Sequence, residues 1–139
     1  MIVLDTNVLS EASRPLPSHR VLAWLGTQPR RLLFATTISE AEMLRGVALL
    51  PVGNRRSALD EATRLLFAED FEGRVLPFDR VAASAYAKIG AERQRIGRPI
   101  APLDAQIAAI ARAHGAAVAT RNVADFTDCG IDVVDPWQD

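Results

Sequence analysis

The chain has 139 residues, of which 49% are hydrophobic and 24% charged, and its 16 basic and 17 acidic side chains leave a net charge of −1. These values are typical of a single soluble globular domain, here residues 1–139, with one sizeable core. A near-neutral chain is not a general polyanion binder, so any contact with nucleic acid requires a local basic patch or a metal ion that neutralises acidic side chains.

Cysteine content and the distribution of apolar residues exclude further classes of protein. One cysteine, Cys129, cannot form an internal disulfide or a cysteine-rich zinc site. No apolar stretch approaches the roughly 20 residues of a membrane-spanning helix, and Asp5 interrupts the apolar start where a signal peptide would continue. We therefore expect a cytoplasmic protein that does not enter a membrane.

The first residues predict a buried strand that ends in polar residues. Ile2-Val3-Leu4 is an unbroken apolar run, typical of a strand covered by helices on both faces. Asp5, Thr6 and Asn7 follow it, and each can cap the helix that residues 8–12 continue. An acid thus lies at the carboxyl end of a central strand, where open α/β sheets bind their ligands.

The rest of the chain alternates short apolar runs with amphipathic segments. The further expected strands are 32–35, 75–78, 117–119 and 131–134. The further expected helices are 18–26, one led by 36–39 that ends between 46 and 50, 55–69, 79–97 and 102–114. This order predicts an α/β fold with a largely parallel sheet. Leu59, Ala62, Leu65 and Leu66 recur at helical spacing and are expected to face the core, with a dimer surface as the alternative.

Further acidic residues follow strands or open helices in the way that Asp5 does. Glu42 follows the strand 32–35, Asp104 lies in the first turn of the helix opened by Pro102, and Asp125 follows the strand 117–119. In a parallel sheet these positions share one rim. The sequence therefore predicts a cluster of carboxylates at the carboxyl ends of the strands.

Each acid also has a purely local interpretation. Ser39 and Glu42 could form a capping box, Asp104 could complement a helix dipole, Asp5 could be a simple cap and Asp125 a turn residue. Together, these interpretations require four unrelated caps to meet at one edge. Clustered carboxylates resist joint ionisation unless a cation binds between them, and Mg²⁺ or Mn²⁺ prefers such oxygen ligands. A metal there can activate water and stabilise charge on a phosphodiester, without a covalent protein nucleophile.

The ordered set of short motifs in the chain resembles the PIN domain, and specifically the VapC-type toxins of bacterial toxin–antitoxin modules, including their FitB-like members. The matching segments are Val3-Leu4-Asp5-Thr6-Asn7 with Ser10-Glu11, Ala41-Glu42 followed by 46–50, Leu76-Pro77-Phe78-Asp79, Asp104 with Ile107-Ala108-Ala109, Val118-Ala119-Thr120-Arg121, and Pro136-Trp137. The resemblance implies a PIN-like α/β/α sandwich with a central, mainly parallel sheet. It also implies an endoribonuclease that depends on Mg²⁺ or Mn²⁺.

Carried over residue by residue, the resemblance makes Asp5 and Asp104 the principal metal ligands, with Glu42 completing the catalytic site. FitB-like chains can carry a further acid where this chain has Asn122, and here Asp125 is the nearest carboxylate. That difference leaves open whether a second metal binds. The remaining site residues are expected to orient Asp5 (Thr6 and Asn7) or to contact an RNA phosphate (Arg121).

The resemblance further implies partners. These are an RNA substrate, a small VapB- or FitA-like antitoxin that blocks the acidic pocket, operator DNA bound through that antitoxin, and a second copy of the chain in a homodimer. Two alternatives remain open: a non-catalytic co-repressor subunit that acts by partner contact, and a nuclease for single-stranded DNA. Trp24 and Leu25 could belong to a core or to an antitoxin groove. Arg93, Arg95 and Arg98 could form a phosphate-contacting patch or a solvated helix end.

Overall fold

The computed structural model describes residues 1–138, which form a parallel five-stranded sheet covered by helices on both faces. The strands, in the spatial order β3-β2-β1-β4-β5, are β1 (Ile2–Leu4), β2 (Leu33–Thr36), β3 (Val75–Leu76), β4 (Ala117–Ala119) and β5 (Val133–Val134). The helices are α1 (Thr6–Ala12), α2 (His19–Thr27), α3 (Thr37–Ala48), α4 (Asn54–Leu65), α5 (Arg80–Arg95), α6 (Pro102–Ala113) and the single turn α7 (Val123–Phe126). Two shorter helical turns are η1 (Arg30–Leu32) and η2 (Leu66–Asp70). The predicted α/β class and central parallel sheet are confirmed.

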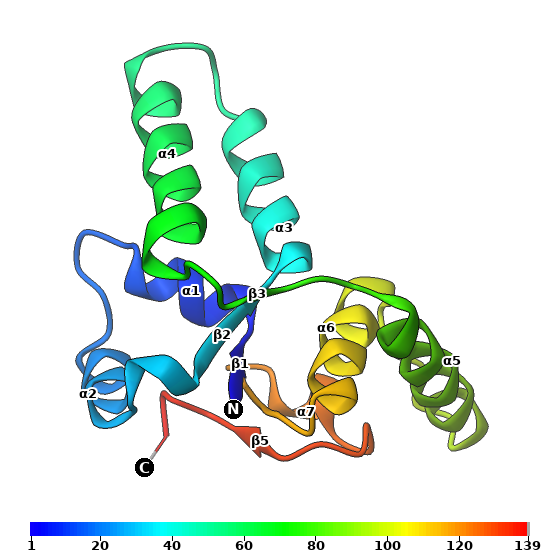
Figure 1. Cartoon of the computed structure of the whole chain (residues 1–139). Coiled ribbons are helices and arrows are strands. Elements are labelled where there is room, and N and C mark those ends of the chain that lie inside the picture. Colours follow the sequence, from blue (N-terminus) through cyan, green and yellow to red (C-terminus); the bar gives the residue numbers. More distant parts are fainter. Residues whose placement is uncertain (139) are drawn as a thin grey trace.

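Alternate residues of each strand supply two separate cores. Val3 of β1 packs with α5 and α6 on one face, whereas the next residue, Leu4, packs with α1, α2 and η2 on the other. β4 divides in the same way, with Val118 in the first core and Ala119 in the second. Figure 1 shows α5 and α6 on one side of the strands and α2 on the other. This alternation is the pleat of a sheet buried on both faces.

The central strand β1 lies between β2 and β4, so three strand ends meet beside it. Ile2 aligns with Leu33 of β2 and with Ala117 of β4, and the ladder to β4 continues through the Asp5 N–H, which donates to the Ala119 carbonyl at 2.9 Å. The chain runs outward from β1 to β3 on one side, and then to β4 and β5 on the other. β1 is therefore the point where strand order reverses, and ligands of such sheets bind at the carboxyl ends there.

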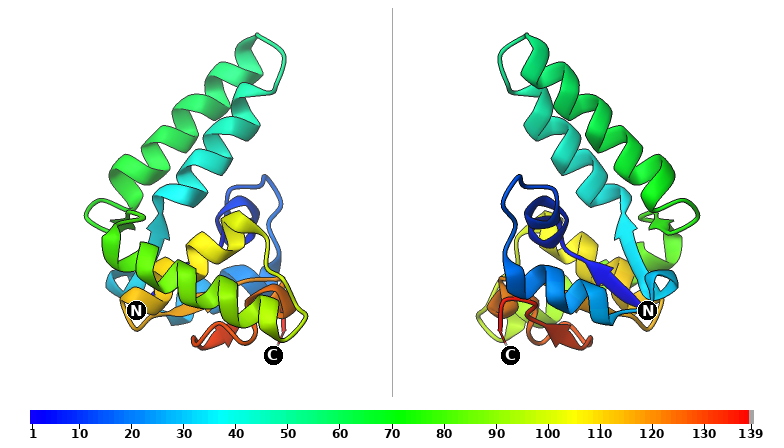
Figure 2. Two further views of the ribbon diagram at one scale, coloured as in Figure 1. Left: turned by 90° about the vertical axis from the view of Figure 1, so that its right-hand side faces the viewer. Right: turned by 90° about the vertical axis from the view of Figure 1, so that its left-hand side faces the viewer.

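Helices α3 and α4 form a hairpin that extends away from the body of the protein (Figures 1 and 2). The prediction that the Leu59–Leu66 face of α4 belongs to the core is wrong for most of its length, since Leu59 is 39% and Leu65 44% exposed. Only Leu66, which begins η2, packs against the second core. Within residues 1–138, α4 packs mainly on α3 over the hairpin, which leaves its outer side exposed.

Several element boundaries differ from the predicted ones. β2 begins one residue later than expected, because Leu32 closes the turn η1, and it runs on to Thr36. The alternative interpretation of Ser39 and Glu42 as a capping box is wrong: α3 begins directly after β2, and the Thr36 hydroxyl caps it by accepting the Ser39 N–H at 3.1 Å. Ser39 is fully buried inside the first turn instead. The expected helix 55–69 divides into α4 and the wider turn η2.

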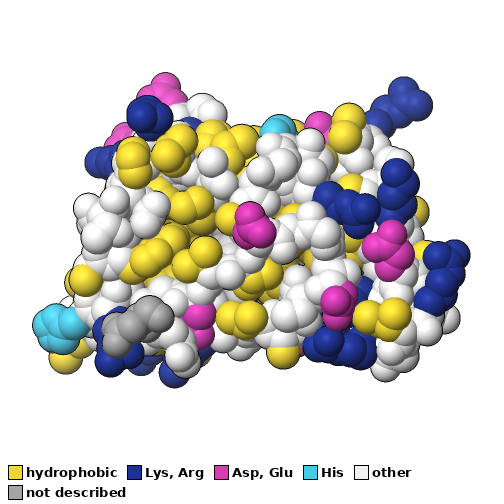
Figure 3. Space-filling model, turned by 90° about the horizontal axis from the view of Figure 1, so that it is seen from below, with side chains coloured by type: hydrophobic (Ala, Val, Ile, Leu, Met, Phe, Trp, Pro, Cys, Tyr) yellow, Lys and Arg dark blue, Asp and Glu magenta, His cyan; other side chains and the backbone are white. Residues whose placement is uncertain are grey.

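Figure 3 views the protein from below, towards the amino ends of the strands. Hydrophobic side chains gather on one half of this face, and Lys and Arg side chains lie mainly towards the half occupied by α5. Asp and Glu side chains are scattered over it and form no cluster. Over the 138 residues that the structure describes, no helix has the length and apolar character needed to cross a membrane.

Candidate active site

Four acidic side chains meet at the carboxyl ends of the strands. Asp5 follows β1, Glu42 lies in the second turn of α3, Asp104 in the first turn of α6, and Asp125 in α7. They are close enough for the other three to raise the pKa of Asp104, and for Glu42 and Asp125 to raise that of Asp5. The structure thus brings together the four acids that the sequence analysis singled out.

Asp5 is the most enclosed of these acids, with 5% of its surface exposed. Its two carboxylate oxygens accept separate hydrogen bonds at 2.8 Å, Oδ1 from the Thr6 N–H and Oδ2 from the Thr120 hydroxyl. Burial raises the pKa of Asp5, while these two hydrogen bonds lower it. Asp5 also caps α1, so the local interpretation of this residue is correct and compatible with a role in the site.

Thr120, which the sequence analysis did not place in the site, connects Asp5 to its neighbours. Its fully buried hydroxyl donates to Asp5 and accepts the Asn122 backbone N–H at 3.0 Å and the Asn7 side-chain amide at 3.4 Å. A hydroxyl has one proton and two lone pairs, so its bonding capacity is complete. Asn7 therefore acts on Asp5 through Thr120. A threonine at the end of the strand next to β1 is the signal that would have indicated it.

Glu42 is held by Thr6, the residue after Asp5. The Thr6 hydroxyl donates to Glu42 Oε1 at 2.9 Å and lies 2.8 Å from the Ser39 hydroxyl. Because Thr6 has only one hydroxyl proton and gives it to the carboxylate, Ser39 must donate to Thr6. The expectation that Thr6 orients Asp5 holds for its backbone N–H, whereas its side chain orients Glu42.

The pKa of Asp104 is raised well above its ordinary value of 3.8. Burial, followed by the charges of Asp5, Asp125 and Glu42, raises the pKa of Asp104 to about 6, and the guanidinium of Arg93 opposes part of this rise. A raised pKa in a group surrounded by carboxylates is the consequence of like charges held together. This crowding is what a bound cation relieves.

The fourth side of the site is the segment after β4. Asn122 precedes α7, and its carbonyl accepts the Asp125 N–H at 3.0 Å, which makes Asp125 part of a helical turn and not of an open turn. Arg121 is exposed, its N–H donates to Asn7 Oδ1 at 3.4 Å, and its guanidinium lies 5.1 Å from the centre of the Trp137 ring. Arg121 is thus a cation held at the edge of the site by an aromatic side chain.

The donor set of this site fits a hard divalent cation. Its carboxylates are the ligands that Mg²⁺ and Mn²⁺ prefer, and hydrogen bonds already orient two of them, Asp5 and Glu42. Within residues 1–138, no three carboxylate, histidine or cysteine side chains already stand at the spacing needed to share one ion. The carboxylates are near one another but repel, and their side chains would have to rotate to bind one common ion.

Neither interpretation of the arginines around Gly97 is correct for Arg93. Its guanidinium is buried, with 4% of the residue exposed, and it donates to backbone carbonyls. Arg98 reaches the same part of the chain through an ion pair with Asp128 at 3.1 Å. Arg95 lies exposed on α5. The cluster is therefore largely an internal contact between the end of α5 and the segment after β4.

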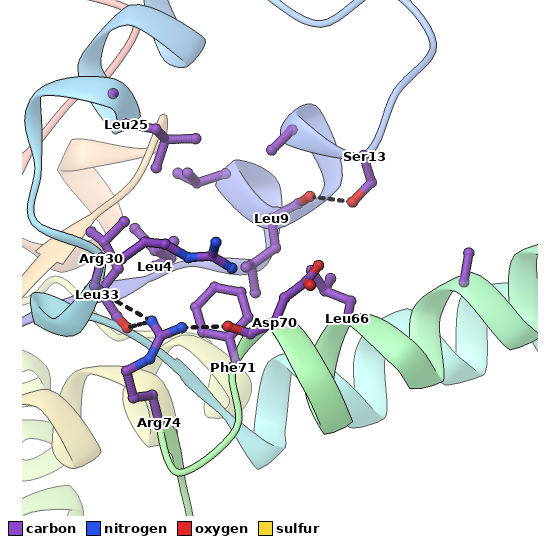
Figure 4. Close-up of a pocket in the computed structure, with 14 residues that line it drawn as sticks. Leu4, Leu9, Ser13, Leu25, Arg30, Leu33, Leu66, Asp70, Phe71 and Arg74 are labelled. Atoms are coloured by element: carbon purple, nitrogen blue, oxygen red, sulfur yellow. Dashed lines mark hydrogen bonds between the residues drawn. The ribbon is translucent and has the colours of Figure 1, made fainter.

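A separate apolar cavity of about 650 Å³ lies between α1, α2, β2 and η2. Figure 4 shows Leu9, Leu25 and Leu66 directed into it, with Arg30 and Arg74 beside it. Arg74 donates to the Leu33 and Asp70 carbonyls, which fixes one wall. None of the four acids lines this cavity. Leu25 thus belongs to a cavity wall, and Trp24 packs against the second core.

Comparisons with known proteins show which family and which solved structures the whole chain is similar to. The PIN domain family model matches residues 2–128. The chain is 41% identical over 138 residues to the VapC ribonuclease Y4jK of Sinorhizobium fredii, covering 99% of both chains, and 41% identical over 139 residues to the toxin FitB of Neisseria gonorrhoeae, covering all of both. The solved structure of FitAB bound to an IR36 DNA fragment superposes with a TM-score of 0.93 at 41% identity, over 99% of this chain and 96% of that one.

Proposed function

This chain belongs to the PIN domain family, in the group that contains VapC ribonucleases and the toxin FitB, and on that basis we propose that it is the toxin of a toxin–antitoxin module and cleaves RNA. We propose further that the cleavage requires Mg²⁺ or Mn²⁺. The observation that carries this proposal is the convergence of Asp5, Glu42, Asp104 and Asp125 on the strand ends, close enough to perturb one another.

Each residue of the site has a definite task in this proposal. Asp5 and Asp104 would hold the ion, with Glu42 and Asp125 completing the acidic wall. The ion, when bound, supplies a Lewis acid that can activate water and offset charge on the phosphodiester. Thr120 and the Thr6 N–H favour the ionised form of Asp5 by donating to it. Arg121 lies at the edge of the site, where its guanidinium can pair with a phosphate of the RNA.

Site variants and a matched control test this proposal directly. The purified chain, Asp5→Asn and Asp104→Asn would be offered single-stranded RNA and single-stranded DNA of one sequence, with Mg²⁺ or Mn²⁺ and with a chelator. Asp132→Asn, which changes an exposed acid just before β5 at the amino end of that strand, is the control. We expect metal-dependent RNA cleavage by the wild type and by the control only.

The other outcomes separate the alternatives. Cleavage of the DNA strand in place of RNA would identify a single-stranded DNA nuclease with the same site. Absence of cleavage with every metal and substrate would favour a co-repressor that acts by contact alone. Cleavage retained by Asp5→Asn or Asp104→Asn would place the chemistry elsewhere in the chain.

We propose that the chain pairs with a small antitoxin and that the pair binds operator DNA. The similarity to FitB in the DNA-bound FitAB complex supports this assignment, since it extends over almost the whole of both chains. On this chain, the apolar cavity between α1, α2 and η2 offers a place for an apolar antitoxin segment. The homodimer expected from the resemblance stays a prediction, to be measured by sedimentation.

A further inference from the structure

The buried guanidinium of Arg93 fastens the end of α5 to the segment that carries Asp125. Its Nη1 donates to the Asp125 carbonyl at 3.0 Å and to the Thr127 carbonyl at 2.8 Å, and it lies 3.6 Å from Cys129 Sγ. Its Nε donates to the Arg98 carbonyl at 2.6 Å. A single side chain thus donates hydrogen bonds to carbonyls of two segments, one just after α5 and the other at the end of α7.

These contacts are unusual for a buried arginine. A buried cation is normally matched by an acid in direct contact, because removing it from water is costly. Among residues 1–138, no carboxylate lies within ion-pair distance of Arg93. The guanidinium is matched by carbonyl dipoles at short range, and by the charge of Asp104 at longer range. The planar guanidinium can donate to several acceptors at once, and this ability is what distinguishes arginine from lysine at position 93.

The segment that Arg93 holds is short and is buried only in part, through Phe126 and Cys129 in the first core. α7 is a single turn of four residues, and Asp125 is exposed within it. Arg98 reinforces the contact from the surface, donating to the Ala124 carbonyl at 3.3 Å and to the Thr127 hydroxyl at 3.1 Å. Phe126 anchors α7 in the first core, and these two arginines add hydrogen bonds to the carbonyls of Ala124, Asp125 and Thr127 around it.

We propose that Arg93 is a positioning residue, which holds Asp125 against the acidic site through its backbone carbonyl and thereby completes the carboxylate set that receives the cation. This inference rests on the proposed function, since it assigns a support to one residue of that site. Arg93 itself does not touch the substrate. Its charge alone would oppose binding of a cation, so any assistance to binding must come from its hydrogen bonds.

Because the charge of Arg93 and its hydrogen bonds have opposite effects on cation binding, the substitution Arg93→Lys is informative. Lysine keeps the positive charge but lacks the planar fork, so it removes the multiple contacts without changing the net charge. Manganese affinity would be measured by calorimetry on folded, metal-free protein, with folding checked by near-ultraviolet circular dichroism. We expect binding to weaken by about tenfold, the usual scale for residues that orient metal ligands. Arg95→Lys, an exposed position on the same helix, is the matched control and should bind as the wild type does.

A double-substitution cycle with Asp125→Asn then tests the route of the effect. If Arg93 acts through Asp125, Arg93→Lys should weaken manganese binding in the wild-type background and have little further effect once Asp125 is neutralised. An undiminished effect in the Asp125→Asn background would overturn the proposal in favour of a general structural role. Unchanged affinity in Arg93→Lys would overturn it as well.

A second variant covers the case in which Arg93→Lys does not fold. Arg98→Lys loosens the same segment from the surface, where the side chain is 47% exposed, without changing the net charge, and should weaken manganese binding by a smaller factor. Unchanged affinity in that variant would contradict the proposal. These binding experiments do not depend on cleavage, so failure of the positioning role and failure of the nuclease proposal give different results.

Discussion

The hydroxyl of Thr6 donates to Glu42 Oε1 across 2.9 Å and so joins the first turn of α1 to the second turn of α3. Thr6 directly follows Asp5, whose carboxylate accepts the Thr6 backbone N–H. One residue therefore positions two of the acidic side chains, one with its backbone and the other with its side chain. The polar residues after β1 therefore do more than cap α1, because they also orient the carboxylates of the site.

We predict that Thr6→Val impairs RNA cleavage while leaving the fold intact. Valine matches threonine in shape but cannot donate to Glu42, and a hydrogen bond to a charged group contributes about 1.5–3 kcal/mol. The rate constant for cleavage should fall by about tenfold or more, measured with RNA in single-turnover reactions. Thr6→Ser retains the hydroxyl and should stay close to wild type. Equal rates for the valine and serine variants would contradict the role of this hydrogen bond.

Thr120→Val should weaken metal binding through Asp5. The substitution removes the donor to Asp5 Oδ2 and leaves a buried carboxylate with one hydrogen bond fewer, which raises the pKa of Asp5 further. Manganese affinity at neutral pH, measured by calorimetry, should fall by about tenfold. Thr120→Ser is the control that keeps the donor. The assignment is wrong if the serine variant loses as much affinity as the valine variant.

Asp104→Asn should stabilise the metal-free protein at neutral pH. The pKa of Asp104 in the folded chain, about 6, lies above the ordinary value of 3.8, so the folded state holds this proton more tightly than the unfolded state does. The stability that the group contributes is therefore complete below about pH 4 and is lost as the pH rises to about 6. Asparagine cannot ionise and avoids this loss.

Thermal unfolding in the presence of a chelator measures this effect. The melting temperature of Asp104→Asn should exceed that of the wild type at about pH 7.5, and the difference should shrink at about pH 5. Asp132→Asn, outside the site, should show no such pH-dependent difference. A wild type that is more stable than Asp104→Asn at neutral pH without metal would contradict the like-charge account.

Manganese binding should weaken as the pH falls through about 6, because a proton on Asp104 competes with the cation for the carboxylate. Titrations at a series of pH values would locate the midpoint of this loss. In Asp104→Asn the residual binding should lack the transition near pH 6. A wild-type affinity that is flat across this range would remove Asp104 from the set of ligands.

Ala62→Arg should disrupt pairing with the antitoxin and spare cleavage. Ala62 lies exposed on α4 and lines the apolar cavity, so an arginine there places a bulky charge in the cavity mouth at little cost to the fold. Copurification with the product of an adjacent antitoxin gene is the measurement. Ala58→Arg, exposed one turn earlier on α4 and outside the cavity lining, is the control. Copurification of Ala62→Arg at wild-type yield would exclude this cavity as the contact.

Much of the fold could be predicted because its local signals agree. The apolar runs at 2–4 and 117–119 are the strands β1 and β4 within the stated bounds, and α6 begins at Pro102 as expected. The core prediction for the α4 face and the alternative interpretation of Ser39 as a cap are both wrong, since both depend on what packs beside these residues. Leu59 and Leu65 have helical spacing but no covering layer, and Thr36 caps α3 because β2 extends to it.

By itself, the sequence determined which acidic side chains are present and where in the chain they occur. Asp5, Glu42, Asp104 and Asp125 each follow a strand or open a helix, and a parallel arrangement directs such positions to one rim. Only the tertiary structure decided which polar group supports which carboxylate. Thr120 reaches Asp5, 115 residues away, because β4 is the neighbour of β1, and Arg93 becomes an internal tether because α5 ends against the segment after β4. Hydrogen bonds act over about 3 Å, so they depend on neighbours in space that spacing along the chain does not specify.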